Sequence, residues 1–564
     1  MSDIKSWGRL FGGAVFLLFA ILSCEKENRE NGQESEPLIE FYQPEYTVKT
    51  GDEITLAAKV ENAVDPVFSW ELNSTVISTT LECVFRGDRA GEYFVNFRVE
   101  TAGGSAEKQL KVTVLDRVLP KIDVDSIVIA FSGVDKEIRA NVLYTGNIVY
   151  EWYCDGKIIS ETNSCIINST VSGEQLLTVK AIAEDGFDIK QIRLRIFPKP
   201  SPEMFFDDGH FRTESDRNRP VRMSVPIGKS LVVAPVICNF RSEEAQFQWS
   251  MDGVPQASTG GFFTFTPAAK GIFRLEVRAT VDSRECAAEV NIECLEPEET
   301  YFRAAKAGRR AKAVNAFAYI PAPGQFINYQ EGSAVENARA EFQKLLDGGG
   351  SSWISLGSFG GYCIAGFDHS VRNVEGKPDI RISGNAFAGS SEPGIVWVMQ
   401  DENGNGLPDD TWYELAGSDS KTPETGRRYA VTYYRPDRSS QSIQWTDNLL
   451  NTGTVAVNAY HTQQSYFPMF IGENYTLCGT CLKSNVEYTD MYRLKDFAWG
   501  YVDNFGDGSR PNNEFWIEDA MQADGSPANL KYVDFVKVHT GMNVTAGYLG
   551  EISCEAGVPA DMNF

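Results

Sequence analysis

A three-fold internal repeat is the feature that most constrains how the first 300 residues can fold. In each copy an aromatic residue, any residue and a tryptophan precede a glycine that opens a run of alternating apolar and polar residues. The pairs are Trp70 and Gly91, Trp152 and Gly173, and Trp249 and Gly271, separated by 21, 21 and 22 residues. Matching offsets in three places indicate one structural unit used three times.

Each copy of the repeat predicts a β-sandwich. Apolar and polar residues alternate over short runs, which is the pattern of half-buried antiparallel strands. A block with one central tryptophan fits a sandwich in which this side chain packs between two sheets. The blocks resemble the PKD-like and Ig-like modules of bacterial surface lipoproteins, and the expected domains are residues 38–117, 118–198 and 203–296. Proline and charged residues at the junctions predict linkers.

The cysteines of the repeats are interpreted first as buried apolar side chains. Cys83 and Cys165 each follow the tryptophan of their block by 13 residues, so they occupy equivalent strand positions. Cys238 and Cys286 flank the third tryptophan in the order found in Ig domains, where two cysteines bridge the sheets. A disulfide between them is one possibility, and Cys294 is a competing partner.

Composition supports an all-β chain and limits its partners. The formal net charge of −25 argues against nucleic acid or anionic lipid as a ligand, because both would be repelled. Aromatic residues make up 12% of the chain and there are 49 glycines, which is typical of short strands and turns. The Cys-x-x-Cys pair Cys478 and Cys481 has no second such pair, so the sequence does not support a structural zinc site.

The segment after a basic connector is assigned to one carboxy-terminal domain, residues 313–564. Six of the ten tryptophans of the chain lie here, between Trp353 and Trp516. One short helix is predicted, with Ser333 able to cap its start and Gly348 ending it. The rest is predicted as strands and loops.

Four stretches of this domain carry a resemblance to a known family. They are residues 355–370, 379–387, 391–401 and 532–538. They resemble a jelly-roll, galactose-binding-like domain of Bacteroidetes cell-surface proteins. The resemblance implies capture of a glycan or another small molecule, either beside an enzyme or beside an outer-membrane importer of nutrients such as corrinoids. A TonB-dependent outer-membrane transporter is the protein partner that this second role implies.

Aromatic side chains of the carboxy-terminal domain are the candidate ligand-binding residues. Their faces suit the apolar faces of sugar rings and of large planar cofactors. The candidates are Trp353, Trp412, Trp445, Tyr460 and Tyr466. The alternative for each of them is a place in the hydrophobic core.

The sequence contains no recognised catalytic motif, which favours a binding protein over an enzyme. Asp368 and His369 are neighbours on a predicted strand, where adjacent side chains point to opposite faces, so no hydrogen bond is expected between them. A pair of glycosidase carboxylates would be recognised only by its separation in space. A carbohydrate-active hydrolase and an adhesin or structural envelope protein therefore stay as alternative functions.

The loop 401–410 is a candidate calcium site. Its expected ligands are Asp401, Asn403, Asn405, Asp409 and Asp410. These oxygen-bearing residues follow the spacing of the first part of an EF-hand loop, although the twelfth position is a tryptophan rather than the usual glutamate. The alternative is a simple hairpin turn between strands 395–400 and 411–415, because Asn-Gly is also a strong turn signal.

The amino terminus predicts export and lipid anchoring. Two basic residues and an apolar run of 13 residues precede Cys24, and this run is too short to span a bilayer. Residues 21–24 resemble a bacterial lipobox, which implies a signal peptide of residues 1–23 and lipidation of Cys24. Residues 24–37 are rich in glutamate and are expected to form a solvated tether. An acidic tether resembles the surface-export signals of Bacteroidetes lipoproteins, so the expected location is the outer face of the outer membrane.

Replacement of Cys24 by alanine should release the protein from the membrane fraction. The reason is that acyl chains on this residue are the anchor that the sequence predicts. Immunoblotting of soluble and membrane fractions measures the change, with Cys83→Ala as the matched control. Retention of the Cys24→Ala variant in washed membranes would contradict the prediction.

Overall fold

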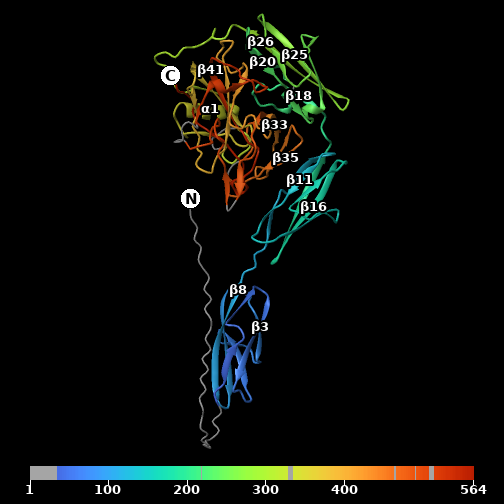
Figure 1. Cartoon of the computed structure of the whole chain (residues 1–564), viewed down its shortest axis with the longest axis vertical. Coiled ribbons are helices and arrows are strands. Elements are labelled where there is room, and N and C mark those ends of the chain that lie inside the picture. Colours follow the sequence, from blue (N-terminus) through green and yellow to red (C-terminus); the bar gives the residue numbers. More distant parts are fainter. Residues whose placement is uncertain (1–34, 218, 328–333, 463–464, 489–490, 507–512) are drawn as a thin grey trace, which may run out of the picture. The chain divides into compact units, whose positions relative to one another are not determined.

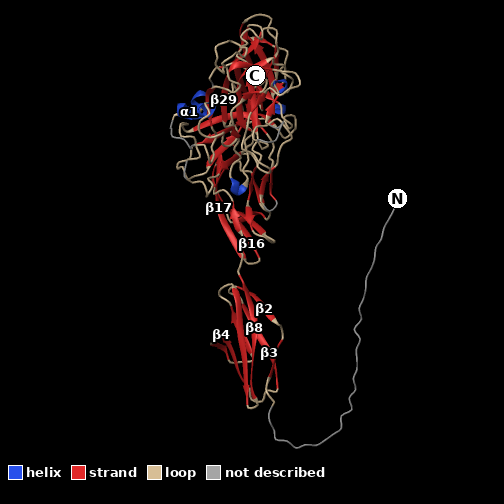
Figure 2. Ribbon diagram, turned by 90° about the vertical axis from the view of Figure 1, so that its left-hand side faces the viewer, coloured by secondary structure: helices blue, strands red, loops and turns tan. Residues whose placement is uncertain are grey.

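The computed structural model describes residues 35–217, 219–327, 334–462, 465–488, 491–506 and 513–564. The predicted signal peptide, Cys24 and most of the tether lie outside these residues. The described chain is all-β with one helix (Figure 2). It divides into two compact units, the first formed by the described part of Met1–Leu119 with Glu184–Gly186, and the second by Pro120–Ala183 with Phe187–Phe564. No described helix is long and apolar enough to cross a membrane.

The three repeats fold into β-sandwiches (Figure 1). Their larger sheets have the same strand order, which confirms the repeat. In each sheet the first strand runs parallel to its neighbour, and the remaining pairs are antiparallel. The sheets are β2 (Glu45–Lys49), β8 (Gly104–Leu115), β7 (Gly91–Thr101), β4 (Val67–Leu72) and β5 (Thr75–Ser78); β10 (Ile127–Phe131), β17 (Gly186–Phe197), β16 (Gly173–Ala183), β13 (Val149–Cys154) and β14 (Lys157–Ser160); β19 (Val221–Pro226), β26 (Arg284–Leu295), β25 (Gly271–Val281), β22 (Gln246–Met251) and β23 (Val254–Pro255).

The opposing sheets are smaller and differ among the three sandwiches. The first has three strands, and each of the other two has two separate strand pairs. The strands are β1 (Leu38–Phe41), β3 (Glu53–Glu61) and β6 (Glu82–Arg86); β12 (Asn141–Leu143) with β9 (Lys121–Asp123) and β11 (Lys136–Arg139) with β15 (Ser164–Ile167); β18 (Glu203–Phe205) with β21 (Val236–Cys238) and β20 (Leu231–Val233) with β24 (Phe263–Phe265).

The repeated tryptophans occupy equivalent positions. Trp70, Trp152 and Trp249 are at most 2% exposed and lie on β4, β13 and β22. The indole N–H of each donates to a backbone carbonyl 10 or 11 residues further along, at 3.1, 2.9 and 2.8 Å. Each ring therefore fills a core while its one polar group is satisfied, which a buried indole requires.

The cysteines of the repeats are buried or half-buried thiols. Cys83 and Cys165 lie on the equivalent strands β6 and β15 and are 1% and 2% exposed, as the sequence predicted. Burial raises the pKa of the Cys165 thiol to about 12, so this thiol is unreactive. Cys238 and Cys286 are both free thiols, and no disulfide joins any of the ten cysteines that the structure describes.

The carboxy-terminal domain contains two larger antiparallel sheets (Figure 1). The six-stranded sheet has the order β27 (Asn315–Ile320), β29 (Tyr362–Arg372), β41 (Tyr532–Thr540), β31 (Gly394–Met399), β32 (Trp412–Leu415) and β40 (Ala520–Met521). The four-stranded sheet has the order β35 (Thr452–Val455), β34 (Ile443–Asp447), β33 (Gly426–Tyr434) and β36 (Asn474–Cys481). Short strands complete the domain: β28 (Ile354–Ser355), β42 (Glu555–Ala556), β39 (Glu514–Phe515), β30 (Ile380–Arg381), β43 (Ala560–Asp561), β37 (Val486–Tyr488) and β38 (Tyr492–Leu494).

The six-stranded sheet is covered on both faces. On one side it shares a core with α1 (Val335–Leu346), the predicted helix, through Phe342 and Leu346. Gly348 follows with a φ of +83°, a conformation that favours glycine and ends the helix. On the other side its residues pack against the four-stranded sheet. The expected capping residue Ser333 lies outside the described residues.

The third sandwich is continuous with the carboxy-terminal domain. Its tryptophan core joins the core of the six-stranded sheet in one cluster of buried residues, whereas the first two sandwiches each have a cluster of their own. The sequence had predicted three sandwiches that each bury their tryptophan in a separate core. The third differs because β19 and β20 contact the carboxy-terminal domain: the N–H of Ser224 donates to the hydroxyl of Thr411 at 2.9 Å, and the N–H of Val232 donates to the side chain of Gln522 at 3.0 Å.

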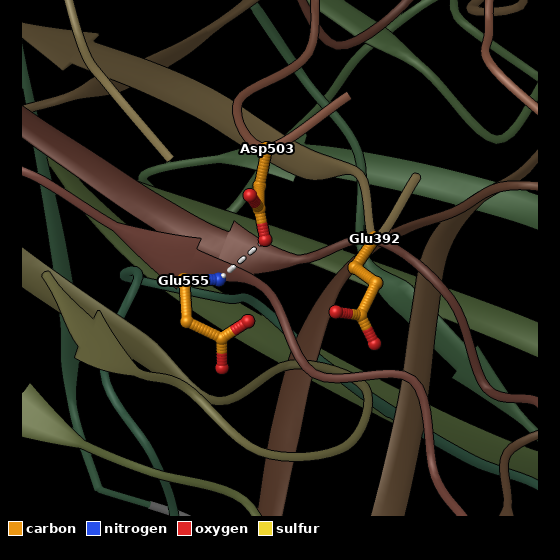
Figure 3. Close-up of side chains that lie close together, drawn as sticks. All are labelled: Glu392, Asp503 and Glu555. Atoms are coloured by element: carbon orange, nitrogen blue, oxygen red, sulfur yellow. Dashed lines mark hydrogen bonds between the residues drawn. The ribbon is translucent and has the colours of Figure 1, made fainter. Parts of the chain in front are cut away.

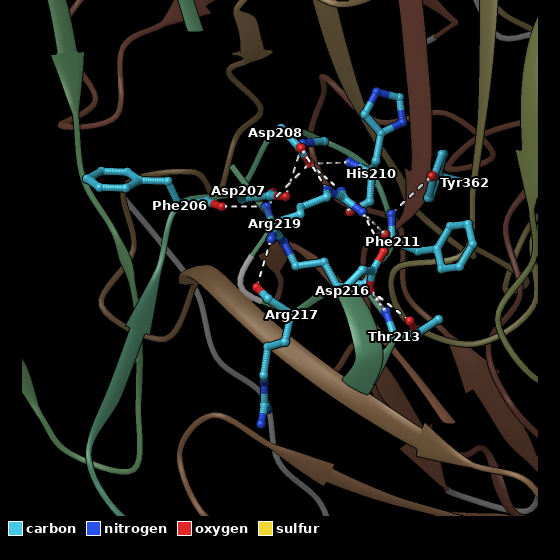
Figure 4. A network of polar contacts seen from close by, with 12 residues as sticks. Phe206, Asp207, Asp208, His210, Phe211, Thr213, Asp216, Arg217, Arg219 and Tyr362 are labelled. Atoms are coloured by element: carbon cyan, nitrogen blue, oxygen red, sulfur yellow. Dashed lines mark hydrogen bonds and ion pairs between the residues drawn. The ribbon is translucent and has the colours of Figure 1, made fainter. Parts of the chain in front are cut away.

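A polar network reinforces this junction (Figure 4). Arg212 is 1% exposed, and its guanidinium donates to the carbonyls of Phe206 and Arg217 at 2.9 Å each. Its backbone N–H donates to the carbonyl of Thr476 on β36 at 3.0 Å, and the backbone N–H of Phe211 donates to the hydroxyl of Tyr362 on β29 at 3.2 Å. The segment 206–217 therefore links the third sandwich to the carboxy-terminal domain.

Alanine substitutions of the repeated tryptophans should destabilise different parts of the molecule. Trp70→Ala should destabilise the first unit by about 3–5 kcal/mol and leave the second unchanged, because each unit has its own core. Trp249→Ala should lower the stability of the third sandwich and the carboxy-terminal domain together. Differential scanning calorimetry resolves the transitions. A Trp249→Ala variant that shifts only a small, separate transition would contradict the shared core.

Candidate functional site

A cleft of about 480 Å³ lies at one edge of the carboxy-terminal domain. Side chains from β27, β28, β42 and the segments before β31 and β42 line it. The polar and aromatic groups on which its chemistry depends are Tyr319, Gln325, Trp353, Glu392, Glu551 and Glu555. Its volume is in the range of small-molecule sites.

Three carboxylates from distant parts of the chain converge at this cleft (Figure 3). Each of Glu392, Asp503 and Glu555 offers one oxygen, and these oxygens lie within 4.8 Å of one another. Glu392 lies two residues before β31, and Glu555 begins β42. Glu392 is half-buried, whereas the other two residues are at most 5% exposed. Three negative charges at this spacing repel one another unless a proton or a cation intervenes.

Backbone donors hold Asp503 in place. One carboxylate oxygen accepts from the N–H groups of Asn385 and Ala386 at 2.6 and 2.8 Å, and the other accepts from the N–H of Glu555 at 2.8 Å. These bonds fix the position of Asp503 and, through it, of Glu555. Asp503 is therefore a positioning residue beneath the cleft, and the glutamates form its accessible acidic wall.

Burial changes the charge state of these carboxyls. It raises the pKa of Glu551 to about 7. It also raises the pKa values of Glu392, Asp503 and Glu555, and the mutual repulsion of these groups adds to the effect for both glutamates. Near neutral pH the cleft therefore holds carboxyls that can each accept or donate a hydrogen bond.

The lining favours a neutral, hydroxylated or cationic ligand over an anionic one. Glu392, Glu551 and Glu555 line the cleft, and none of its described lining residues is a lysine, arginine or histidine. The half-buried indole of Trp353 supplies an aromatic face beside them. Carboxyl groups next to an aromatic face match a sugar ring, which has hydroxyls at its edge and C–H groups on its faces.

The five predicted aromatic residues do not form one surface. Trp353 lines the acidic cleft, and Trp412 on β32 lines a different cavity. Trp445 on β34 is half-buried and covers Gly453 of the neighbouring strand β35. Tyr460 is 79% exposed in a loop.

The prediction for Tyr466 is wrong. Its side chain is 0% exposed in the core between the two large sheets, and its hydroxyl donates to the carbonyl of His461 at 2.9 Å. A side chain that is enclosed on all faces cannot stack on a ligand at the surface. Sequence pattern cannot separate such a tyrosine from an exposed one, because both follow loop residues.

Among the described residues, the carboxylates of the predicted calcium loop do not form a group of three ligand atoms within 4.8 Å of one another. The strands on either side of it pair as predicted, through Trp397 with Glu414 and Val398 with Tyr413. The N–H of Gly406 donates to one oxygen of Asp401 at 3.0 Å, and the other oxygen of that carboxylate is buried with no hydrogen bond to any described residue.

The remaining predicted ligands of the loop contact one another. The amide nitrogens of Asn403 and Asn405 donate to Asp409 at 3.0–3.1 Å. Burial raises the pKa of Asp410 to about 7. The neighbouring residue Glu402, which the sequence did not single out, is 5% exposed with one carboxylate oxygen unpartnered among the described residues.

The expectation for His369 is also wrong. Its Nδ1 lies 2.9 Å from an oxygen of Asp368, and its Nε2 lies 2.9 Å from an oxygen of Asp561. The pairing of β29 with β41 is irregular between Gly366 and Val371, so the alternation of side chains on which the expectation depended is interrupted. His369 is 0% exposed and ties β29 to the end of the chain.

Sequence reasoning missed the acidic cleft, although part of its signal was present. Glu551, Ser553 and Glu555 alternate, which places three polar groups on one side of an extended segment. That pattern predicts a polar face but does not identify its partners. Glu392 and Asp503 are at least 48 residues away in the chain, and only the fold brings them to the same place.

One comparison with known proteins supports the first repeat. The family model described as a PKD-like domain matches residues 37–101. A search of curated proteins finds no significant match. Among solved structures, the I-band fragment I67–I69 from titin is 14% identical, with 45% of this chain and 97% of that chain covered and a TM-score of 0.21. The fibronectin(III)-like modules of CbhA from Clostridium thermocellum are 19% identical, with 28% and 95% covered and a TM-score of 0.18.

A third example is the group of three N-terminal domains of the outer capsid protein Hoc from bacteriophage RB49. It is 13% identical, with 46% of this chain and 99% of that chain covered and a TM-score of 0.22. Similarity at this level carries no argument about function. The family match and the sheets themselves show an all-β protein with PKD-like and Ig-like repeats.

Stability of the second unit should depend on the protonation of Glu551. The pKa of Glu551 in the folded state, about 7, lies above the value of about 4.3 for an exposed glutamate. The contribution of this group to the stability of the folded state is therefore complete below pH ~4.5 and is lost as the pH rises through 7. Between pH 4.5 and 8.5, the free energy of unfolding of Glu551→Gln should therefore fall by on the order of 3 kcal/mol less than that of the wild type. Chemical denaturation at both pH values measures this. The exposed Glu243→Gln variant is the control, and equal losses in all three proteins would contradict the assignment.

Proposed function

We propose that this protein is a surface-exposed outer-membrane lipoprotein that captures a glycan or another small hydroxylated molecule in the acidic cleft. The observation that carries the proposal is the cleft of about 480 Å³, in which carboxyl groups lie beside Trp353. Hydroxyl groups of a sugar are suited to these hydrogen-bonding carboxyls, and the indole provides a face for the ring. The lipid on Cys24 would anchor the chain at the cell surface.

The cleft favours a glycan unit over a corrinoid. About 480 Å³ can enclose one or two sugar rings, whereas a corrin macrocycle with its side groups exceeds the range of such a pocket. In this proposal the protein serves a TonB-dependent outer-membrane transporter, to which it passes the captured molecule. A corrinoid bound at the rim, and an adhesin without a small ligand, are the alternatives that the test separates.

Substitution of Trp353 should abolish ligand capture. Isothermal titration of the full chain with neutral oligosaccharides should give saturable heat, and Trp353→Ala should weaken binding at least tenfold because the stacking face is lost. Tyr460→Ala, an exposed aromatic outside the cleft, should bind as wild type does. Heat with a corrinoid alone would identify the other nutrient class. No heat with either class would contradict capture and favour the adhesin.

Hydrolysis is the second candidate function, and one distance favours it. The nearest oxygens of Glu392 and Glu555 lie no more than 4.8 Å apart, which is nearer to the carboxyl separation of retaining glycosidases, about 5–5.5 Å, than to that of inverting ones, about 6.5–9.5 Å. The titrated oligosaccharides are therefore also analysed for release of reducing ends. Turnover that Glu392→Gln and Glu555→Gln both abolish would establish an enzyme, whereas intact oligosaccharide would support capture.

We also propose that the loop 401–410 binds calcium as a structural ion. An unpartnered carboxylate oxygen of Asp401, the unpartnered oxygen of Glu402 and the raised pKa of Asp410 support this, because buried carboxylates without a cation are costly. Oxygen ligands at this spacing are those that calcium prefers.

Calcium should raise the melting temperature of the second unit. The expected result is a higher transition temperature in millimolar calcium than in excess chelator, because an ion that binds only the folded state stabilises it. Asp401→Asn should remove the difference, and Glu243→Gln should keep it. The same melting temperature for the wild type in both solutions would contradict the calcium proposal and favour a simple hairpin turn.

A further inference from the structure

Glu392 carries an unpaired and accessible carboxylate oxygen at the acidic cleft. The side chain lines the cleft and is half-buried. Its Oε1 accepts one long hydrogen bond, of 3.4 Å, from the backbone N–H of Ser553. Its Oε2 receives no hydrogen bond from any residue that the structure describes, and the protein does not enclose this atom. Oε2 is therefore available to a ligand.

The carboxylate of Glu555 lies close to that of Glu392 (Figure 3). One oxygen of each glutamate is no more than 4.8 Å from the other. None of the described residues that line the cleft is a lysine, arginine or histidine. Burial raises the pKa of Glu392 and raises that of Glu555 to about 8, and repulsion between the acidic groups adds to both shifts. A positive charge between the two glutamates would stabilise their ionised forms.

A protonated primary amine fits this separation. It has three N–H donors in tetrahedral directions, and each charge-assisted N–H···O bond is about 2.7–2.9 Å long. Two oxygens on such bonds are therefore about 4.4–4.7 Å apart. This value agrees with the limit of 4.8 Å for the two glutamates.

A sugar hydroxyl is a poorer match for the pair. It has one O–H donor, so it can donate to only one of the two carboxylates, and it brings no charge. An ammonium group donates to both and reduces their repulsion. The net charge of −25 also favours the approach of a cation.

The cleft suits an organic cation better than a bare metal ion. The third carboxylate, Asp503, directs both of its oxygens to backbone N–H groups, so two glutamates remain as free ligands. Calcium, for comparison, takes about six to eight oxygen ligands. The indole of Trp353 lines the same cleft and offers a face that suits both a sugar ring and an ammonium group.

We propose that the acidic cleft selects an amino sugar, whose free primary amine is held between Glu392 and Glu555 while Trp353 contacts the ring. This inference rests on the proposed capture of a glycan in the cleft and specifies the chemical class of that glycan. N-acetylation removes the charge and all but one of the donors of the amine. Acetylated and neutral sugars therefore bind more weakly than the amino sugar.

The selection is tested on the full chain by isothermal titration near pH 7 with three β-1,4-linked disaccharides. They are the disaccharide of glucosamine, the disaccharide of N-acetylglucosamine, and cellobiose, which differ only in the amine, acetamide or hydroxyl at carbon 2. The glucosamine disaccharide should bind at least tenfold more tightly than the other two, and its affinity should fall as the salt concentration rises. The amine without a ring, 2-aminoethanol, should bind at least tenfold more weakly than the glucosamine disaccharide.

Glu392→Gln keeps the size of the side chain and removes its charge. It should reduce the preference for the glucosamine disaccharide over cellobiose to about threefold or less. Glu555→Gln gives a second, independent measurement of the same ratio. The exposed Glu243→Gln variant is the control and should keep the full preference. The melting temperature of each variant is measured first to confirm folding.

The outcomes separate this inference from the proposed function. Equal affinities for the three disaccharides, or a tenfold preference that persists in folded Glu392→Gln and Glu555→Gln, would overturn the selection of an amine and leave glycan capture intact. Binding of 2-aminoethanol as tight as that of the glucosamine disaccharide would overturn the selection of a sugar. No saturable heat with any of the three disaccharides would overturn both the inference and the capture.

Discussion

Burial of the central strand β41 on both faces is the constraint on which the second unit depends. All nine residues of Tyr532–Thr540 are buried, although Asp534, Lys537 and His539 are polar. Most polar groups buried in this way are paired. Arg303, Ser370 and the backbone of residue 401 satisfy Asp534, and the carbonyl of residue 209 accepts from Lys537 at 2.6 Å.

These pairings explain why distant segments gather around one sheet. The connector before the carboxy-terminal domain, the start of the third sandwich and the first residue of the acidic loop each provide a partner for β41. The third sandwich is therefore held to the carboxy-terminal domain by hydrogen bonds inside an apolar interface as well as by the interface itself. A charge buried without its partner costs several kcal/mol, so the arrangement is strongly specified.

Several acidic groups without an ion-pair partner lie at the proposed sites of this domain. Glu392 and Glu555 at the cleft, Glu402 in the loop and Glu414 on β32 all lie where burial disfavours their charge. Other carboxylates are paired with a cation, as Asp208 is with Arg219 and Asp534 is with Arg303, both at 2.8 Å. Carboxyl groups kept poorly solvated and poorly paired are available to a ligand, an ion or a proton.

Local pattern was enough to predict the repeats, the one helix and the hairpin strands around the acidic loop. Each depends on residues near in sequence: the spacing of tryptophan and glycine, the periodicity that ends at Gly348, and the alternation in β31 and β32. The same pattern misassigned Tyr466 and His369. The first is enclosed by a sheet formed far away in the chain, and the second lies in a bulge that pattern does not show.

The sequence by itself determined the all-β class, the three-fold repeat and the buried tryptophans, because hydrophobic periodicity and turn residues act over short distances. Only the tertiary structure decided that the third sandwich shares its core with the carboxy-terminal domain, and which carboxylates meet. Glu392, Asp503 and Glu555 come from three separate segments, and the side chains around Glu414 come from several strands. Proximity of this kind depends on sheet order and on packing between sheets, which no local spacing of residues encodes.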